Sequence, residues 1–333
     1  MTFQEIAIEK YGGAQTLKVR DRQPTPPGPG EVAIDVAYSG VNFADVQMRL
    51  GFYPDAPKRP FVPGYEVSGR VAEVGPGVEG VTPGDLVAAG TYFGGYASRV
   101  TVPAGQVLRV PRGLDLRAGA AMPVAFFTAH VALFEMARIR KGDRVLIECA
   151  TGGVGVLAMQ LARHAGAEVT GLTTSPHKKA FIEGYGAIAY TRDEFRNDAS
   201  LRGYDFILNA SGGAEITWQR ARLGITGRIV CIGVNSGVKD GRRNLPRMAW
   251  AALRTPRISV LKLFDENTGV YALNALHVLR DPAWIARLST AFDALEDVPL
   301  TPHVGKVFPA VDVASAHACL ETKQATGKVL LEW

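Results

Sequence analysis

The chain has 333 residues, of which 47% are hydrophobic and 21% are charged. This length suits about two domains of roughly 150 residues each, and the composition excludes disordered, collagen-like and coiled-coil chains. The net charge is +5, and residues 239–262 alone hold seven basic side chains against one acidic side chain. Because the excess of positive charge is confined to one stretch, a uniformly basic nucleic-acid binder is not expected.

The N-terminal sequence and the cysteines bear on where the protein works. The first residues, MTFQEIAIEKYGG, lack the basic and then apolar segments of a secretory signal. The most apolar window, residues 119–137, contains Pro123 and Glu135, whereas a membrane-spanning helix needs about 20 nearly uninterrupted apolar residues. Three cysteines without a Cys-x-x-Cys spacing cannot form a paired framework; they are Cys149, Cys231 and Cys319. A reducing compartment, the cytoplasm, is therefore expected.

Residues 1–122 are predicted to form a small β-barrel or β-sandwich. Short apolar or alternating runs are separated there by glycine and proline, as in residues 32–41, 65–75, 84–90 and 97–105. Several short strands with turn residues between them are typical of such folds.

Residues 123–265 are predicted to form a second domain with a parallel sheet. An apolar strand over residues 143–150 precedes a glycine cluster, and helices then alternate with strands, which indicates βαβ units. The β-forming run Ile258–Phe264 is predicted as a strand at the open edge of this sheet. The remaining chain, residues 266–333, is assigned to the first domain, with helices at 270–279, 282–295 and 313–322 and strands at 303–308 and 327–333.

The sharpest local signal is a glycine turn between a strand and a helix. The sequence Ala150-Thr151-Gly152-Gly153-Val154-Gly155 matches G-x-G-x-x-G at its second and third glycines. Gly152 would let the backbone approach a pyrophosphate, Gly155 would let the helix pack closely on the strand, and the helix N-terminus would offer free N–H groups. An ordinary tight turn is the alternative, but the strand–turn–helix–strand context favours dinucleotide binding.

The end of the next strand bears on which dinucleotide binds. A site for NAD usually places an acid there to hold the ribose 2′-hydroxyl, but this strand ends at Thr174 and Ser175 and leads to Lys178 and Lys179. Hydroxyl and ammonium groups suit a 2′-phosphate, which a carboxylate would repel. NADPH is therefore the predicted cofactor, with a solvated first helical turn as the alternative explanation of the lysines.

These motifs together resemble the zinc-independent quinone oxidoreductases of the medium-chain dehydrogenase/reductase superfamily. The resemblance covers nearly the whole length, and the sequence around residues 244–276 looks most like the branch of the vesicle amine transport protein homologues. The matching stretches are Val41–Asp45 with Arg49–Pro54, Pro63–Glu66, Gly69–Val71, Gly94–Ala97, Thr128-Ala129, the TGGVG turn and Gly327–Leu330. The resemblance implies an α/β fold in which a GroES-like β-barrel catalytic domain is joined to a Rossmann, doubly wound parallel sheet.

The same resemblance implies that no metal is bound. Zinc-containing relatives carry a Cys-His pair where this chain has Asn42-Phe43, and Gly-His-Glu where it has Gly64-Tyr65-Glu66. Zinc sites use thiolate, imidazole or carboxylate ligands, and the four-cysteine structural lobe of those relatives is missing here. Without an ion to polarise an alcohol, reduction of an electrophilic enone or quinone is the easier chemistry, because it needs only orientation and one or two hydrogen-bond donors.

The resemblance also assigns residues to the site. In the first domain Asn42 would donate an amide N–H to the substrate oxygen or the nicotinamide ribose, or cap a loop. Tyr53 would line the pocket or donate a proton, or pack on the barrel. Asp45 is an orienting carboxylate rather than a general base, and Tyr65 would fill the vacant zinc position. On the cofactor side the assigned residues are Thr128, Gly152, Gly153, Val154, Gly155, Thr174, Ser175, Lys178, Asn209, Gly233 and Phe264.

The predicted function is an NADPH-dependent reductase that transfers hydride to a quinone or an α,β-unsaturated carbonyl, in a homodimer joined through the strand at Ile258–Phe264. The alternative is an NADPH-binding protein without turnover that docks on anionic membranes through the basic residues 239–262. Binding of single-stranded nucleic acid by the same stretch is the least favoured function, since only Trp250 could stack on bases.

Overall fold

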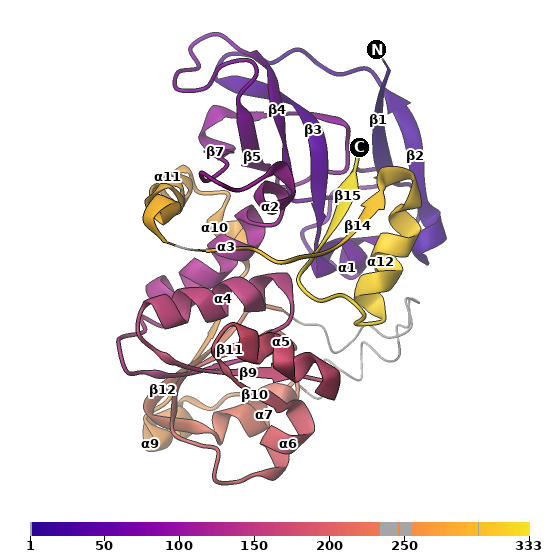
Figure 1. The fold of residues 1–333 in the computed structure, drawn as a ribbon. Coiled ribbons are helices and arrows are strands. Elements are labelled where there is room, and N and C mark those ends of the chain that lie inside the picture. Colours follow the sequence, from indigo (N-terminus) through magenta and orange to yellow (C-terminus); the bar gives the residue numbers. More distant parts are fainter. Residues whose placement is uncertain (1, 234–245, 247–252, 254, 299) are drawn as a thin grey trace. The chain divides into compact units, whose positions relative to one another are not determined.

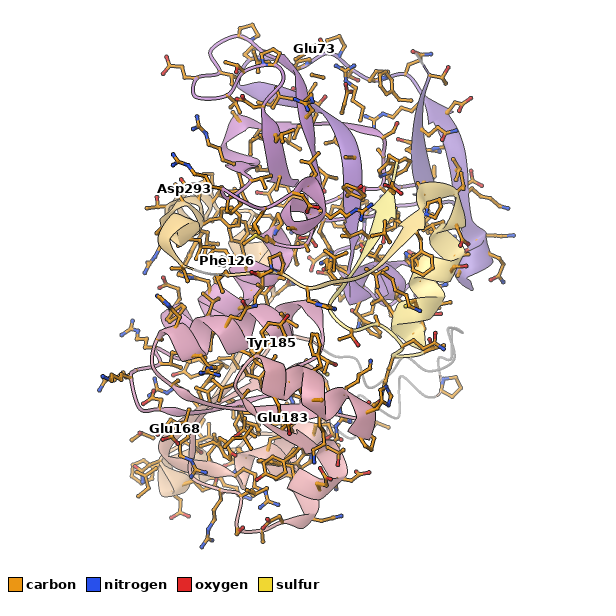
Figure 2. The ribbon with its side chains drawn as sticks, in the orientation of Figure 1. Glu73, Phe126, Glu168, Glu183, Tyr185 and Asp293 are labelled. Carbon is orange, nitrogen blue, oxygen red and sulfur yellow. The ribbon has the colours of Figure 1, made fainter. Side chains whose placement is uncertain are left out.

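The computed structural model describes residues 2–233, 246, 253, 255–298 and 300–333. The described chain divides into two compact units, one made of residues up to 124 and from 276 onward, the other of residues between 125 and 275. Within both, the core is made mainly of apolar side chains, with a few buried charged ones among them. Figure 2 labels examples, since Phe126 is fully buried whereas Glu73 and Glu168 are exposed. The basic stretch assigned to membrane docking falls mostly outside the described residues.

The first unit is built on a seven-stranded sheet (Figure 1). Its strand order is β14-β15-β3-β4-β5-β7, and β6 pairs with β3. All pairs are antiparallel except β14 with β15. The strands are β3 (Glu31–Val41), β4 (Glu66–Val74), β5 (Leu86–Gly90), β6 (Arg99–Pro103), β7 (Val107–Arg109), β14 (Val304–Pro309) and β15 (Lys328–Glu332).

Further elements surround this sheet. A separate antiparallel pair is formed by β1 (Phe3–Ile8) and β2 (Leu17–Arg22). Alternation along β3, β4 and β6 buries a core of valines, including Val32, Val67 and Val100. The helices are α1 (Phe43–Leu50), α2 (Leu116–Ala120), α11 (Pro282–Asp293) and α12 (Val313–Glu321), while α3 (Pro123–His130) and α10 (Ala275–Val278) span the divisions between the units. The strands predicted in the first 122 residues are confirmed as β3, β4, β5 and β6.

The second unit is a six-stranded, entirely parallel sheet. The alternating pattern predicted its parallel strands, and its order, β10-β9-β8-β11-β12-β13, is the doubly wound order that the resemblance implies. The strands are β8 (Arg144–Ile147), β9 (Glu168–Thr173), β10 (Ile188–Thr191), β11 (Tyr204–Asn209), β12 (Leu223–Cys231) and β13 (Gly269–Ala272). The helices are α4 (Gly153–His164), α5 (Lys179–Gly184), α6 (Arg192–Asn197), α7 (Glu215–Arg220) and α9 (Val260–Glu266), and a π-helical segment spans Val131–Met136.

The predicted strand Ile258–Phe264 is wrong, because this run forms helix α9. Leucine, lysine and glutamate within it favour a helix, and Asn267 ends the helix in the left-handed conformation with φ 50°. The preference of valine and phenylalanine for strands depends on a neighbouring strand that can pair with them. The outer position in the sheet is instead taken by β13, which pairs with β12 from Arg228↔Gly269 to Cys231↔Ala272. The helix predicted over 270–279 is accordingly reduced to α10.

Candidate functional site

The glycine turn joins β8 to α4 in the second unit. Gly152 is the N-cap of α4, with φ −88° and ψ 170°. A Cβ at Gly155 would lie 2.4 Å from the carbonyl oxygen of Cys149 and 2.7 Å from Cα of Ala150, so packing of the helix on the strand requires glycine there. A Cβ at Gly152 would lie 3.4 Å from the same oxygen, an ordinary contact. The first N–H groups of α4, those of Gly153 and Val154 among them, have no carbonyl partner within the helix and are of the kind that bind an anion.

The end of β9 carries the residues assigned to the 2′-phosphate. Thr174 is exposed, and the backbone N–H of Ser175 donates to Oγ1 of Thr173 at 3.1 Å. Lys178 is only 8% exposed and is engaged within the protein. Lys179 instead forms an ion pair with Glu194 at 3.0 Å. Thr174 therefore offers an exposed hydroxyl at this strand end, with no acid beside it in the sequence.

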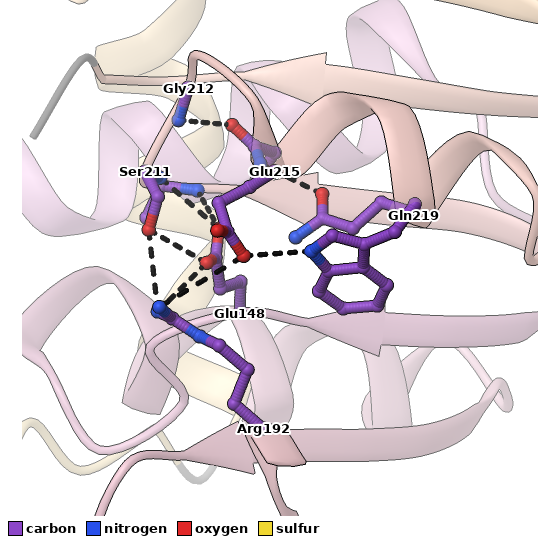
Figure 3. A network of polar contacts seen from close by, with 9 residues as sticks. Glu148, Arg192, Ser211, Gly212, Glu215 and Gln219 are labelled. Atoms are coloured by element: carbon purple, nitrogen blue, oxygen red, sulfur yellow. Dashed lines mark hydrogen bonds and ion pairs between the residues drawn. The ribbon is translucent and has the colours of Figure 1, made fainter. Parts of the chain in front are cut away.

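Asn209, at the end of β11, is fully buried and takes part in the following three hydrogen bonds. Its Nδ2 donates to Oε1 of Gln219 at 2.8 Å, and its Oδ1 accepts from the N–H of Gly212 at 2.8 Å (Figure 3). Its backbone carbonyl accepts from Ile232 at 2.9 Å. These bonds shape the loop after β11, and the assignment of Asn209 to the nicotinamide ribose stays a prediction.

A buried carboxylate that sequence reasoning missed organises the same loop. Glu148 directly follows β8 and is 1% exposed. Its Oε2 accepts from the N–H groups of Ala210 and Ser211 at 3.0 and 3.1 Å, and its Oε1 accepts from Oγ of Ser211 at 2.7 Å and from Arg192 at 3.0 Å (Figure 3). Glu148 therefore ties the loop after β11 to the turn after β8.

Replacing Glu148 by alanine should lower the free energy of unfolding by about 3 kcal/mol or more, because two backbone N–H groups and the Arg192 guanidinium lose a buried acceptor. Urea unfolding followed by circular dichroism measures this. Glu215 is the matched control, since it lies 4.0 Å from Arg192 and is 23% exposed. Its replacement by alanine should cost about 1 kcal/mol or less. Equal losses in the two variants would contradict the role of Glu148.

Three other residues were assigned to the cofactor. Thr128 is in α3 and is 6% exposed, and Gly233 follows β12 and is half-buried. Phe264 is 81% exposed on α9. The carbonyl of Asn267, just after α9, accepts from the N–H of Thr226 near the start of β12. Phe264 therefore lies toward the amino end of the sheet, whereas the glycine turn follows the carboxyl end of β8.

In the first unit, Asn42 is held by two charged side chains. Its Nδ2 donates to Oε1 of Glu66 at 2.9 Å, and its Oδ1 accepts from Nζ of Lys328 at 2.7 Å. Lys328 also pairs with Glu66, whose other oxygen accepts from the N–H of Val124 at 2.8 Å. Glu66 is 0% and Lys328 5% exposed. Sequence reasoning had noted Glu66 and Lys328 only as parts of family motifs.

Asp45 is fully buried and accepts three hydrogen bonds. Its Oδ2 accepts from the N–H of Asn42 at 2.7 Å and from Oη of Tyr96 at 3.1 Å, and its Oδ1 accepts from the N–H of Gly64 at 3.2 Å. Burial outweighs these bonds and raises the pKa of Asp45 to about 7. Since Asp45 has no exposed surface, it orients the start of α1 rather than contacting a ligand.

The Tyr96 hydroxyl also bonds to Nε2 of His317 at 3.1 Å, deep in the same unit. His317 is fully buried, and this burial, together with the nearby charge of Arg49, lowers its pKa to about 3. Asp45, Tyr96 and His317 therefore form one buried chain of hydrogen bonds, in which burial raises the pKa values of Asp45 and Tyr96 and lowers that of His317.

Tyr53 and Tyr65 lie together, with ring centroids 6.2 Å apart. Tyr65 is 7% exposed and Tyr53 is half-buried. Burial raises the pKa of both hydroxyls, so both are protonated at neutral pH and are able to donate. Among the residues that the structure describes, no group of three or more His, Cys, Asp or Glu side chains could hold a metal ion.

Comparisons with known proteins agree with this architecture. Two family models match, the alcohol dehydrogenase GroES-like domain over residues 28–112 and the zinc-binding dehydrogenase over residues 185–331. The synaptic vesicle membrane protein VAT-1 homolog of Rattus norvegicus is 30% identical over 98% of this chain and 83% of its own length. In the described part of the chain, no helix has the length and apolar character that crossing a membrane requires.

Two solved structures extend the comparison to cofactor and activity. A mycobacterial protein in complex with NADPH has a TM-score of 0.85 and 27% identity, over 99% of this chain and 100% of that chain. The CurK enoyl reductase has a TM-score of 0.82 and 28% identity, over 99% of both chains.

Proposed function

We propose that this chain is an NADPH-dependent reductase of quinones or α,β-unsaturated carbonyl compounds. The chain belongs to the zinc-independent quinone oxidoreductase-like branch of the medium-chain dehydrogenase/reductase superfamily. The observation that carries the proposal is the glycine at position 152, where the surrounding protein would leave room for a Cβ atom. A glycine that internal packing does not need, at the N-terminus of a 12-residue helix, fits the approach of a pyrophosphate.

The residues of the chain divide into two roles in this proposal. NADPH, when bound, supplies the hydride. The N-terminus of α4 holds the pyrophosphate, and the remaining cofactor contacts proposed are Thr128, Gly153, Val154, Thr174, Ser175, Lys178 and Gly233. In the first unit, the second N–H of the Asn42 amide donates to the substrate oxygen, and Tyr53 and Tyr65 are protonated donors that can complete proton transfer.

The function is tested by following NADPH oxidation with a 1,4-quinone, a 2-alkenal and a cyclic enone, with and without a metal chelator. We expect turnover of at least one of these classes, at a rate that the chelator leaves unchanged. NADPH binding without turnover of any of them would overturn the proposal. Sedimentation with vesicles of acidic lipid then tests the alternative function, a membrane-docking protein that binds NADPH without using it.

Cofactor selectivity gives a second test at the end of β9. Unmutated protein should bind NADPH more tightly than NADH. Thr174→Asp should weaken NADPH binding about tenfold or more and leave NADH binding nearly unchanged, because a carboxylate there repels only the 2′-phosphate. Thr174→Asn is the control, because the asparagine side chain has the shape of the aspartate side chain without its charge. Fluorescence titration measures both affinities, and an equal loss for both cofactors would contradict the assignment.

We also propose a homodimer formed through the β13 edge of the parallel sheet. β13 is the outermost strand on its side of the described sheet. Exposed apolar side chains lie on α9 just before it, with Val260, Leu261 and Phe264 exposed by 79%, 79% and 81%. An unpaired apolar edge is an aggregation hazard, and pairing about a two-fold axis closes it. Light scattering at micromolar concentration should give the mass of two chains, and Leu261→Glu with Phe264→Glu should give one. A monomeric unmutated protein would contradict the dimer.

A further inference from the structure

The Asn42 amide lies between two charges of opposite sign. The ammonium of Lys328 can only donate hydrogen bonds, and the carboxylate of Glu66 can only accept them. Lys328 bonds to Oδ1 of Asn42 at 2.7 Å, and Glu66 bonds to Nδ2 at 2.9 Å. Rotating the amide by 180° would place N–H against ammonium and carbonyl against carboxylate. The two charged groups therefore permit one orientation of this amide.

The charged pair that holds the amide is itself firmly placed. Lys328 is 5% exposed on β15, Glu66 is 0% exposed on β4, and the two side chains form an ion pair. Glu66 has both oxygens engaged, the second by the N–H of Val124 at 2.8 Å. A buried pair with satisfied hydrogen bonds gives a rigid support, because a shift of either charge would leave the other unpaired.

This orientation decides what Asn42 offers to a ligand. Its carbonyl oxygen and one N–H are used, so the group that remains free of a protein partner, among the described residues, is the second N–H of Nδ2. That group is a donor only.

We propose that Lys328 and Glu66 are positioning residues that present Asn42 as a hydrogen-bond donor to an acceptor oxygen of the substrate, a carbonyl or quinone oxygen on which negative charge develops. The inference rests on the proposed function and deepens it, since it names the chemical group of the substrate that the first unit recognises. A hydrogen bond that strengthens as charge develops on the acceptor acts on the rate rather than on ground-state binding.

Four proteins test it kinetically: the unmutated chain, Asn42→Ala, the double variant Glu66→Gln with Lys328→Met, and the triple variant. Both charges are removed together so that neither is left buried alone. Asn42→Ala should lower kcat for an enone about 100-fold, with KM for NADPH changed less than about twofold. The double variant should lose about tenfold or more. Adding Asn42→Ala to the double variant should cost much less than it costs in the unmutated chain, because the amide is no longer held.

A purely structural role of the pair predicts a different result, in which Asn42→Ala costs the same factor in both backgrounds. That outcome overturns the inference. Glu5→Gln is the control for loss of a buried carboxylate in the same unit, since Glu5 pairs with Arg20 at 2.6 Å and is 5% exposed. It should change stability but leave both kinetic constants within about twofold.

The orientation is also measurable without turnover, by NMR of the Asn42 side-chain amide in 15N-labelled protein. One of its two protons should be protected from exchange in the unmutated chain and exposed in the double variant. If no enone or quinone is reduced, the proposed function fails, and this measurement still decides whether the pair orients the amide. Equal exchange of the amide protons in both proteins would overturn the inference whatever the activity.

Discussion

In the variant Asp45→Asn, the free energy of unfolding is expected to fall by about 3 kcal/mol between pH 6.5 and about pH 4. In the unmutated protein, the titrations of Asp45 and His317 together should change it little over this range. Burial raises the pKa of Asp45 from 3.8 to about 7, so in this range the folded state keeps a proton that the unfolded chain has released. Asp45 therefore adds stability as the pH falls. Each pH unit within the range is worth about 1.4 kcal/mol.

His317 acts in the opposite direction over nearly the same range. Its pKa is lowered from 6.5 to about 3, so below pH 6.5 the unfolded chain takes up a proton that the folded state does not. Stability is thus lost as the pH falls. In the unmutated protein, the pH dependences of stability that arise from Asp45 and from His317 offset each other. When Asp45 is removed, the pH dependence that arises from His317 remains.

Urea unfolding at a series of pH values measures these slopes as differences from the unmutated protein. Asp45→Asn should become less stable toward low pH, and His317→Gln should become less stable as the pH rises from about 4 to 7. The double variant should restore the original pH dependence at lower overall stability. Curves for the single variants that run parallel to that of the unmutated protein would exclude the offset.

The two glycines of the turn after β8 should separate packing from ligand binding. Gly155→Ala should destabilise the protein by about 1–3 kcal/mol and abolish NADPH binding, because the new Cβ would meet backbone atoms at 2.4 and 2.7 Å and α4 would have to move. Gly152→Ala should cost about 1 kcal/mol of stability or less, since the contact is 3.4 Å. It should nevertheless weaken NADPH binding about tenfold or more.

Urea unfolding and fluorescence titration of NADPH on the same two preparations give both quantities. Gly166→Ala, at a left-handed position with φ 81° after α4, is a further control that should lower stability without a specific effect on affinity. An affinity for NADPH that Gly152→Ala leaves unchanged would refute the placement of the pyrophosphate at this turn.

What the sequence could predict was local. The turn Gly152–Gly155 and the strands on either side of it are read from a short pattern, because a tight strand-to-helix turn imposes its requirement on neighbouring residues. The parallel sheet then follows from the alternation of elements, and its doubly wound order from the resemblance to a known family. The resemblance to a known family supplied the fold of the first unit, which is confirmed by the matched GroES-like domain.

The sequence-based predictions are wrong or incomplete where residues far apart in the chain come into contact. Whether Ile258–Phe264 becomes a strand depends on pairing with β12, and residues 269–272 take that position. The bond between Lys328 and Asn42 joins residues 286 apart, and that between Glu148 and Ser211 joins residues 63 apart. No spacing rule relates such positions, so the buried charges around Asn42 and in the loop after β11 required the folded structure.

The place of β15 in the first sheet has a consequence for the order in which the protein acquires its structure on the ribosome. β15 (Lys328–Glu332) lies between β14 and β3, and its residues pair with Tyr38 to Val41. This sheet is therefore incomplete until β15 has been made, whereas the described parallel sheet, which lies between β7 and β14 in the sequence, has all its strands by residue 272. During synthesis, which proceeds at about 5–20 residues per second, the parallel sheet can close first, and the β3 edge stays open for several seconds more. Nascent chains are then most exposed to strand-pairing with one another at β3.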